Sequence, residues 1–189
     1  MALQYPQTEL FSEVSKGATE LGQSLNKARQ FKNIVPAIQS SQERGASVPL
    51  AERYKNLGVT TTPYMRRTRF EAAHPGIDLA AAPETPIPAV ASGVVTDIKT
   101  GQVRGSPGFG NYVIVQDAQG NQFRYSHLSS SYVPVKLGQQ VATGTILGGM
   151  GNTGQVYSST LGGSGTHLDL RIKNYFDQYV DPMKYLGNQ

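Results

Sequence analysis

Short runs of alternating hydrophobic and polar residues, separated by glycine-containing turns, fill much of the chain from residue 74 to residue 186. Alternation of this kind is typical of strands that bury one face. Valine-rich segments at 89–98 and 110–121 predict strands, with turns at Ser92-Gly93 and at 119–121. The pattern predicts a mainly β domain, an antiparallel β-sandwich whose concave face can hold an extended substrate. Glycines that we expect to supply turns of positive φ follow at Gly138, Gly144, Gly148, Gly151 and Gly154.

The first sixty residues follow a different pattern. Between residues 8 and 30, apolar residues recur at intervals of three, four or seven, which predicts an amphipathic helix with Thr8 as its N-cap. A helix with an apolar stripe needs a partner, which is the β domain, the same helix in another copy or a larger assembly. The stripe consists of Leu10, Val14, Leu21, Leu25 and Ala28.

Breaks in the helical pattern divide the chain into two parts. The segment 40–47 is rich in small and polar residues, and the segment 58–63 has the composition of a linker. We therefore expect an N-terminal helical docking and linker region at 1–62 and a β domain at 63–189. A hydrophobic content of 38% in 189 residues suffices for one modest core plus this extension. The absence of cysteine excludes disulfides and thiolate metal ligands.

The three histidines are the candidates for chemistry, because each has a carboxylate, a hydroxyl or a glycine-rich turn beside it. His74 and Asp78 frame the sequence H-P-G-I-D, in which proline and glycine disfavour a helix and favour a turn into a strand. His167 and Asp169 alternate with leucines, so a strand directs both to one face and the leucines to the core. With His127, these residues can supply the ligands and proton-transfer groups of one hydrolytic zinc site.

The same segments occur in the order of a known family. H-P-G-I-D-L-A-A from His74 is followed by Y-S-H-L-S at 125–129 and by G-Q-Q-V-A-T-G-T-I-L-G-G-M-G-N-T-G at 138–154. In this order, residues 74–186 resemble the lysostaphin-like zinc peptidoglycan endopeptidases, which include the LytM-type domains. The resemblance implies the LytM-type β-sandwich, a duplicated hybrid motif. It also implies that His74 and Asp78 bind zinc and that His127 and His167 are catalytic.

The last motif departs from the family pattern, which is His-x-His with the second histidine as the third zinc ligand. Here that position is Asp169. Asp169 can ligate zinc itself, because a carboxylate oxygen binds at nearly the same distance as an imidazole nitrogen. Together with Asp78 it neutralises the ion, leaves zinc-bound water less acidic and admits harder ions such as manganese. If the site is only weakened, Asp169→His should raise activity.

Two other interpretations of Asp169 stay open. In one, metal affinity is lost and the domain survives as a structural or peptidoglycan-binding component. In the other, the whole constellation is a structural coincidence. Four of the five family site residues are present and the fifth is another competent ligand type, which favours activity.

An active site of this kind is that of a zinc metalloendopeptidase. Activated water attacks a peptide carbonyl, and His127 and His167 stabilise the oxyanion or transfer protons. The implied substrate is a peptide cross-link of bacterial peptidoglycan. Aromatic residues that can line its groove are Phe109, Tyr112, Tyr125, Tyr132 and Tyr157, with strand packing as the plainer role for Tyr125.

Charge and the N-terminus bear on location and partners. The net charge is +4, and the cluster of Arg66, Arg67 and Arg69 suits anionic cell-wall polymers or a simple solvated basic face. No nucleic-acid-binding motif accompanies the charge. The chain begins without a secretory signal and contains no run long and apolar enough to span a membrane. We therefore expect a bacteriophage virion protein, in the tail or internal core, that opens the wall during genome injection and docks on other virion proteins through its N-terminal helix. A lysis-stage endolysin and secretion by another route are the alternatives.

Overall fold

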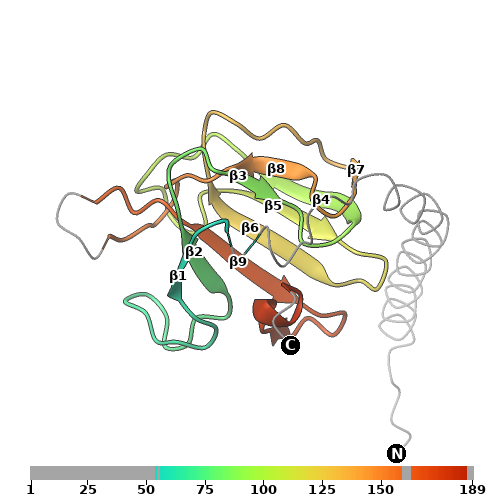
Figure 1. Ribbon diagram of the computed structural model, residues 1–189, viewed down its shortest axis with the longest axis horizontal. Helices are drawn as coiled ribbons and strands as arrows, with labels where there is room; N and C mark the ends of the chain where they lie inside the picture. The colour runs from blue at the N-terminus through green and yellow to red at the C-terminus, as the bar shows by residue number, and fades with distance from the viewer. Residues whose placement is uncertain (1–53, 55, 159–162, 187–189) are drawn as a thin grey trace, which may run out of the picture. The chain divides into compact units, whose positions relative to one another are not determined.

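The structure, a computed structural model, describes residue 54 and residues 56–158 and 163–186 (Figure 1). Regular structure in these ranges is almost entirely β, which confirms the predicted fold class. No helix in the described ranges is long and apolar enough to cross a membrane. The elements are β1 (Val59–Thr62), β2 (Ile77–Ala80), β3 (Pro86–Pro88), β4 (Gly93–Lys99), β5 (Asn111–Gln116), β6 (Gln122–Leu128), β7 (Gln140–Val141), β8 (Ile146–Gly149), β9 (Leu168–Lys173), β10 (Tyr179–Val180) and the 3-10 helix η1 (Pro182–Lys184).

Antiparallel pairing joins most strands into one sheet with the order β1-β2-β9-β6-β5-β4-β7, and β10 pairs with β9. β3 and β8 form a second, two-stranded sheet. Both sheets contribute to one hydrophobic core, in which Ile87 of β3 and Leu147 of β8 join Val113 of β5. The hydroxyl of Tyr125 in β6 accepts a hydrogen bond from the backbone N–H of Val90 at 2.8 Å and so ties the layers together.

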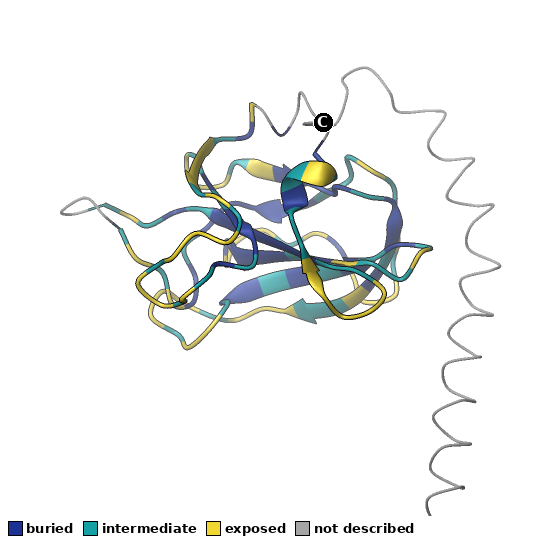
Figure 2. Ribbon diagram, turned by 90° about the horizontal axis from the view of Figure 1, so that it is seen from below, coloured by how far each residue is buried: buried dark blue, intermediate teal, exposed yellow. Residues whose placement is uncertain are grey.

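The two faces of the large sheet carry different side chains, as alternation along a strand requires. On the core face, Leu168 and Leu170 of β9 are fully buried in the hydrophobic core, which confirms their predicted orientation. Figure 2 shows buried residues concentrated in the strands at the centre of the domain and exposed residues mostly in the outer loops. On the opposite face, Asp169 of β9 stands in register between Asp78 of β2 and Ser126 of β6. Three neighbouring strands thus bring polar side chains to one place on the sheet.

The predicted linker at 58–63 is wrong. Residues Val59–Thr62 form β1, which pairs with β2, and Leu57 just before it is buried in the core. Tyr54 is buried as well, and its hydroxyl donates a hydrogen bond to the carbonyl of Pro88. The β domain therefore begins before residue 63. The predicted N-terminal helix lies outside the described residues.

The glycines play two different structural roles. Gly138, Gly144 and Gly154 have positive φ, as expected for turns. Gly151 does not; instead, a Cβ there would lie 2.5 Å from the backbone nitrogen of Ser129, so this glycine permits a close approach of two backbones. The turn at 119–121 is present, whereas Ser92-Gly93 is not a hairpin turn because residue 93 begins β4.

Candidate metal centre and active site

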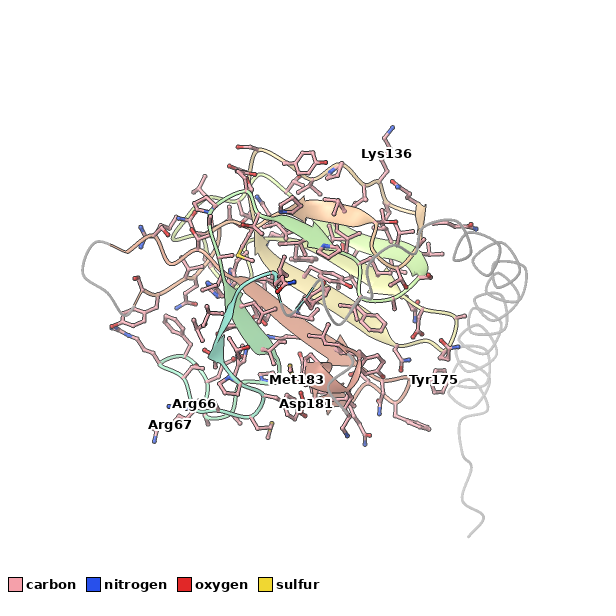
Figure 3. The ribbon with its side chains drawn as sticks, viewed as in Figure 1. Arg66, Arg67, Lys136, Tyr175, Asp181 and Met183 are labelled. Atoms are coloured by element: carbon pink, nitrogen blue, oxygen red, sulfur yellow. The ribbon has the colours of Figure 1, made fainter. Side chains whose placement is uncertain are left out.

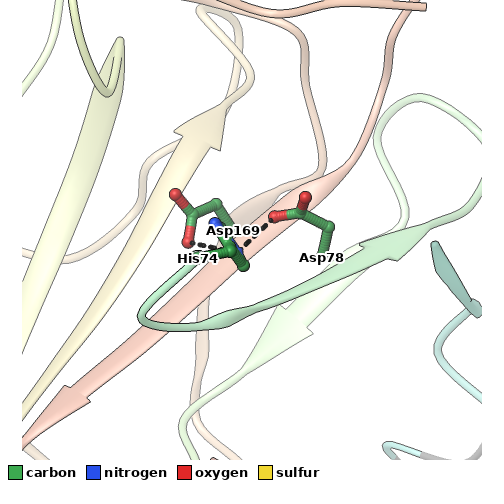
Figure 4. A group of neighbouring side chains, drawn as sticks. All are labelled: His74, Asp78 and Asp169. Atoms are coloured by element: carbon green, nitrogen blue, oxygen red, sulfur yellow. Dashed lines mark ion pairs between the residues drawn. The ribbon is translucent and has the colours of Figure 1, made fainter. Parts of the chain in front are cut away.

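Three potential ligand atoms gather where β2 and β9 lie side by side (Figure 4). Asp78 and Asp169 are direct partners in this pairing, and His74 comes from the turn that leads into β2. His74 Nε2 lies 3.1 Å from Asp78 Oδ1 and 3.8 Å from Asp169 Oδ1. One nitrogen or oxygen atom of each residue lies within 4.8 Å of the other two. The fold therefore brings the three predicted metal ligands together.

This donor set fits a zinc ion. Tetrahedral zinc with bonds of about 2.1 Å places neighbouring ligand atoms about 3.4 Å apart, and the distances of 3.1 and 3.8 Å from His74 Nε2 lie on either side of this value. His74 Nε2 and Asp78 Oδ1 are both buried and face each other, and neither makes a further hydrogen bond among the described residues. Buried polar atoms are normally paired, and a bound cation would satisfy both atoms at once.

The electrostatics of the group favour the charged forms. Burial lowers the pKa of His74, but the carboxylates of Asp78 and Asp169 outweigh burial and raise it above its ordinary value. Burial raises the pKa of Asp78, but the contact with His74 and the charge of His167 bring it below its ordinary value. Because the pKa of His74 is raised, a metal ion at Nε2 competes with a proton there, so metal binding should weaken as the pH falls.

Two further charged residues contact the ligands and were not selected from the sequence. Glu71 accepts a hydrogen bond from His74 Nδ1 at 2.8 Å, and Arg171 donates hydrogen bonds to both Glu71 and Asp169. Burial raises the pKa of Glu71, but the hydrogen bonds from Arg171 and His74 lower it. A signal for Arg171 was present, because it continues the alternation of His167 and Asp169 along the same strand face.

His127 and His167 lie beside the ligand group, with ring centroids 4.7 Å apart. Nδ1 of His127 donates to the carbonyl of Thr153 at 2.7 Å, and Nδ1 of His167 donates to the carbonyl of Gly165 at 2.8 Å. A carbonyl oxygen can only accept, so each neutral ring carries its proton on Nδ1 and leaves Nε2 unprotonated. His167 Nε2 lies 4.0 Å from Asp78 Oδ1, which places it next to the ligands.

His127 has an unusual backbone conformation, with φ of +59°. Such a left-handed conformation is uncommon outside glycine and persists only where the surroundings hold it. Here the backbone N–H donates to the carbonyl of Phe109 at 3.0 Å, and the side chain is bound to Thr153. Burial, together with the charge of His167, holds the pKa of His127 below its ordinary value.

The ligands and both histidines line a cavity of about 690 Å³. Of the five aromatic residues predicted for a substrate groove, Phe109 and Tyr157 line this cavity, whereas the other three do not. The groove prediction for Tyr125 is wrong, because its side chain is fully buried on the core face and bonded to Val90. Tyr112 lies outside this cavity, and its hydroxyl donates to Asp97 Oδ2 at 2.9 Å.

The basic cluster precedes the site in the loop between β1 and β2. Arg66 and Arg67 point outward from the domain (Figure 3). Arg69 is exposed too, but it lines the cavity, and its guanidinium carbon lies 5.0 Å from the ring centroid of Tyr157. One of the three arginines therefore faces the candidate site.

Residues 72–182 match peptidase family M23. This span covers more than half of the chain and contains all five predicted ligand and catalytic residues. The chain belongs to peptidase family M23. The resemblance to the lysostaphin-like, LytM-type peptidases is thereby confirmed.

Individual relatives agree with this assignment. The chain is 39% identical over 105 residues to the peptidoglycan DD-endopeptidase ShyA of Vibrio cholerae, an alignment that covers 56% of this chain and 21% of ShyA. The chain thus spans about a fifth of the length of this curated relative.

Solved structures of M23 peptidases share the fold. The catalytic domain of the prophage-encoded M23 protein EnpA from Enterococcus faecalis, in a point-mutant form, is similar with a TM-score of 0.52 and 29% identity, over 66% of this chain and 88% of that one. Lysostaphin from Staphylococcus simulans is similar with a TM-score of 0.57 and 28% identity, over 72% of this chain and 52% of that one.

Proposed function

We propose that this chain is a zinc metalloendopeptidase that hydrolyses peptide cross-links of bacterial peptidoglycan. The observation that carries the proposal is the group of His74, Asp78 and Asp169, whose potential ligand atoms lie within 4.8 Å of one another. This group lies beside two histidines in an open cavity. The names of two relatives support the class of reaction: ShyA is a peptidoglycan DD-endopeptidase, and lysostaphin is an antimicrobial peptidase.

The residues of the site divide the proposed reaction between them. His74, Asp78 and Asp169 would hold the zinc ion, which would supply Lewis-acid chemistry for a peptide carbonyl and for water. The resting ring of His127 is neutral because burial disfavours its charged form, and its Nδ1–H is committed to Thr153. Its Nε2 therefore takes a proton from the attacking water and passes it to the leaving amine. His167 donates a hydrogen bond to the developing oxyanion when its Nε2 is protonated.

A second candidate function is a catalytically degenerate M23 domain with a structural or peptidoglycan-binding role. It rests on Asp169, which stands where the family pattern has a histidine. Two observations support the enzyme instead. Asp169 pairs directly with Asp78 across the strands, and its Oδ1 faces His74 Nε2 at 3.8 Å, as a ligand atom should.

Digestion of purified, cross-linked peptidoglycan by the full-length, zinc-loaded chain tests the proposal. We expect cross-linked muropeptides to decrease and new amino termini to appear by liquid chromatography and mass spectrometry. Chelation should stop the reaction and added zinc should restore it. His74→Ala should bind no zinc and be inactive, whereas Lys136→Ala, an exposed change outside the cavity, should match the unchanged protein.

The same experiment separates the two candidates. Zinc binding without cleavage, together with sedimentation of the chain with insoluble peptidoglycan, favours the binding role. A folded protein that binds no zinc and cleaves nothing overturns the proposed enzyme.

We further propose that the chain acts from a phage virion, in the tail or internal core, with its N-terminal segment docked on other virion proteins. The prophage origin of the similar protein EnpA supports a phage source. Antibody detection of the chain in gradient-purified particles tests this placement. Presence in lysates but not in particles favours a lysis-stage role instead.

A further inference from the structure

Arg171 donates hydrogen bonds to both carboxylate oxygens of Asp169. Its Nε donates to Oδ1 at 3.0 Å and to Oδ2 at 2.9 Å, and its Nη2 lies 2.8 Å from Oδ2. Two guanidinium nitrogens therefore engage Oδ2, whereas only one engages Oδ1. Oδ1 is the atom that faces His74 Nε2. Because only one hydrogen bond from Arg171 uses Oδ1, this oxygen keeps a lone pair for a metal ion. Asp169 is only 2% exposed, and this contact fixes its orientation.

The same guanidinium binds Glu71 through Nη1 and through Nη2, which it shares with Asp169. Arg171 Nη1 donates to Glu71 Oε1 at 2.7 Å, and Nη2 donates to Oε2 at 3.0 Å. Glu71 Oε2 in turn accepts the Nδ1–H of His74 at 2.8 Å. A carboxylate at this place keeps the proton of the neutral ring on Nδ1, so Nε2 offers its lone pair to the site. The side chains of Asp169, Arg171, Glu71 and His74 thus form one connected chain around the ligand group.

We propose that Arg171 is a positioning residue that makes Asp169 a metal ligand: it aims Oδ1 at the site and, through Glu71, holds His74 with Nε2 facing the metal. The inference rests on the proposed zinc site. Asp169 and Arg171 then act as a pair that replaces a single neutral ligand. Arg171 also balances one of the three carboxylates that the site gathers, those of Glu71, Asp78 and Asp169.

Electrostatics and positioning predict opposite results for the removal of Arg171. A guanidinium close to a divalent cation repels it, so its removal should strengthen zinc binding if charge alone matters. If Arg171 positions the ligands, its removal should weaken zinc binding. Loss of a residue that hydrogen-bonds to metal ligands typically weakens metal binding by about 10- to 100-fold. The direction of the change in zinc affinity therefore separates the two roles.

The pairing also changes what we expect from Asp169→His. An imidazole cannot offer Arg171 two acceptor oxygens, so the single substitution leaves a buried cation with half of its carboxylate partners beside the metal. We therefore expect Asp169→His alone to weaken zinc binding, whereas the sequence by itself predicted that this substitution raises activity if the site is only weakened. Adding Arg171→Gln to Asp169→His should recover part of the affinity.

The test is the zinc dissociation constant of the full-length chain, measured by competition with a chromophoric chelator. Arg171→Met should raise it about 10- to 100-fold. Arg171→Lys keeps the charge but lacks the planar fork, so it should also raise the constant. Glu71→Gln should raise it about tenfold, because one acceptor oxygen becomes a donor.

Arg124→Met is the matched control. Arg124 is the cross-strand partner of Arg171, and its guanidinium carbon lies 3.5 Å from the ring centroid of Phe109. Its Nε and Nη2 have no hydrogen-bond partner among the described residues. The substitution therefore removes a neighbouring positive charge without touching the carboxylate of Asp169. We expect zinc affinity to stay within about twofold or to rise slightly, since less positive charge then faces the ion.

Circular dichroism of the metal-free variants shows which of them fold. If Arg171→Met does not fold, the zinc affinities of the two single variants Arg171→Lys and Glu71→Gln test the positioning role instead. Zinc binding by the folded Arg171 variants as tight as that of the unchanged protein overturns the inference and leaves the proposed function intact. Tighter zinc binding by Asp169→His alone also overturns it. Absence of zinc binding by the unchanged protein overturns both proposals.

Discussion

The two halves of the site are held in place by different means. The ligand half, formed by His74 and the two aspartates, is fixed by strand register and by the charged side chains of Glu71 and Arg171. The histidine half, His127 and His167, is fixed by backbone carbonyls that accept their Nδ1–H groups. One half depends on side-chain identity, and the other depends on the path of the backbone.

This difference teaches which changes each half tolerates. A side-chain network can be altered by substituting its members together, as in Asp169→His with Arg171→Gln. A carbonyl position is set by how closely loops approach. A Cβ on Gly154 would lie 2.6 Å from the carbonyl oxygen of Gly108 and equally close to Cα of Gly110. Gly154 follows Thr153, whose carbonyl accepts the Nδ1–H of His127. The position of this histidine therefore depends on a glycine that takes no part in the chemistry.

The largest expected effect comes from His127→Ala, which removes the proposed proton acceptor from the histidine half. Cleavage of cross-linked muropeptides should fall by about 10²- to 10⁴-fold, because a proton-transfer group is lost. Bound zinc, measured by elemental mass spectrometry, should be unchanged because His127 is outside the ligand group. Unchanged cleavage would show that His127 takes no part in the reaction.

Gly154→Ala should disturb the same half through the backbone. Gly154 has φ of +82°, and the added Cβ meets backbone atoms of Gly108 and Gly110. We expect the free energy of unfolding to fall by about 2–3 kcal/mol, measured in urea, and activity to fall with it.

Gly101→Ala is the matched control, because its φ is +77° but no atom lies within 4 Å of the added Cβ. It should show only the smaller cost of positive φ. Zinc affinity of the folded Gly154→Ala protein should be retained, and a large loss would show that the two halves are not independent.

The pH dependence of His127 sharpens the comparison further. Burial and the charge of His167 hold its pKa below the ordinary value of 6.5. Its neutral, proton-accepting form should therefore persist below pH 6.5, and kcat/KM should decline only at lower pH. NMR titration of the histidines in metal-free protein measures this directly. His167→Ala should raise the pKa of His127, because a like charge is removed; a lower value would contradict the assigned cause.

Tyr125→Phe should have the smallest effect. The substitution leaves the buried N–H of Val90 without its acceptor, so the free energy of unfolding should fall by about 1–2 kcal/mol. Both kcat and KM should stay unchanged, because Tyr125 does not line the cavity. A loss of activity at unchanged stability would show that Tyr125 contacts the substrate after all.

Much of the fold could be predicted because strand alternation is a local signal. Leu168 and Leu170 face the core as their positions require, and the hairpin at Gly120 forms as predicted. The linker prediction failed at β1, whose residues are mostly exposed and polar. An edge strand of this composition has no hydrophobic alternation to reveal it, and its pairing with β2 defines it instead.

In the candidate site, too, some residues could be predicted from local sequence and others only from tertiary contacts. The histidines and carboxylates could be selected because few residue types bind zinc or transfer protons at neutral pH. For Tyr125 the sequence offered a place in the groove beside the plainer role in strand packing, because an aromatic residue suits both. Its burial in the core and the hydrogen bond from Val90 decide for packing. The predicted N-terminal helix lies outside the described residues and stays a prediction.

By itself, the sequence determined the β class of the domain, its family and the chemical identity of the ligands and proton-transfer groups. Only the tertiary structure decided that Glu71 meets Arg171, two residues 100 positions apart in the chain. It likewise decided that Arg171 turns Asp169 toward His74. Local patterns specify which face of a strand a side chain occupies, whereas contacts between distant segments depend on how the strands pair and on how closely their backbones approach.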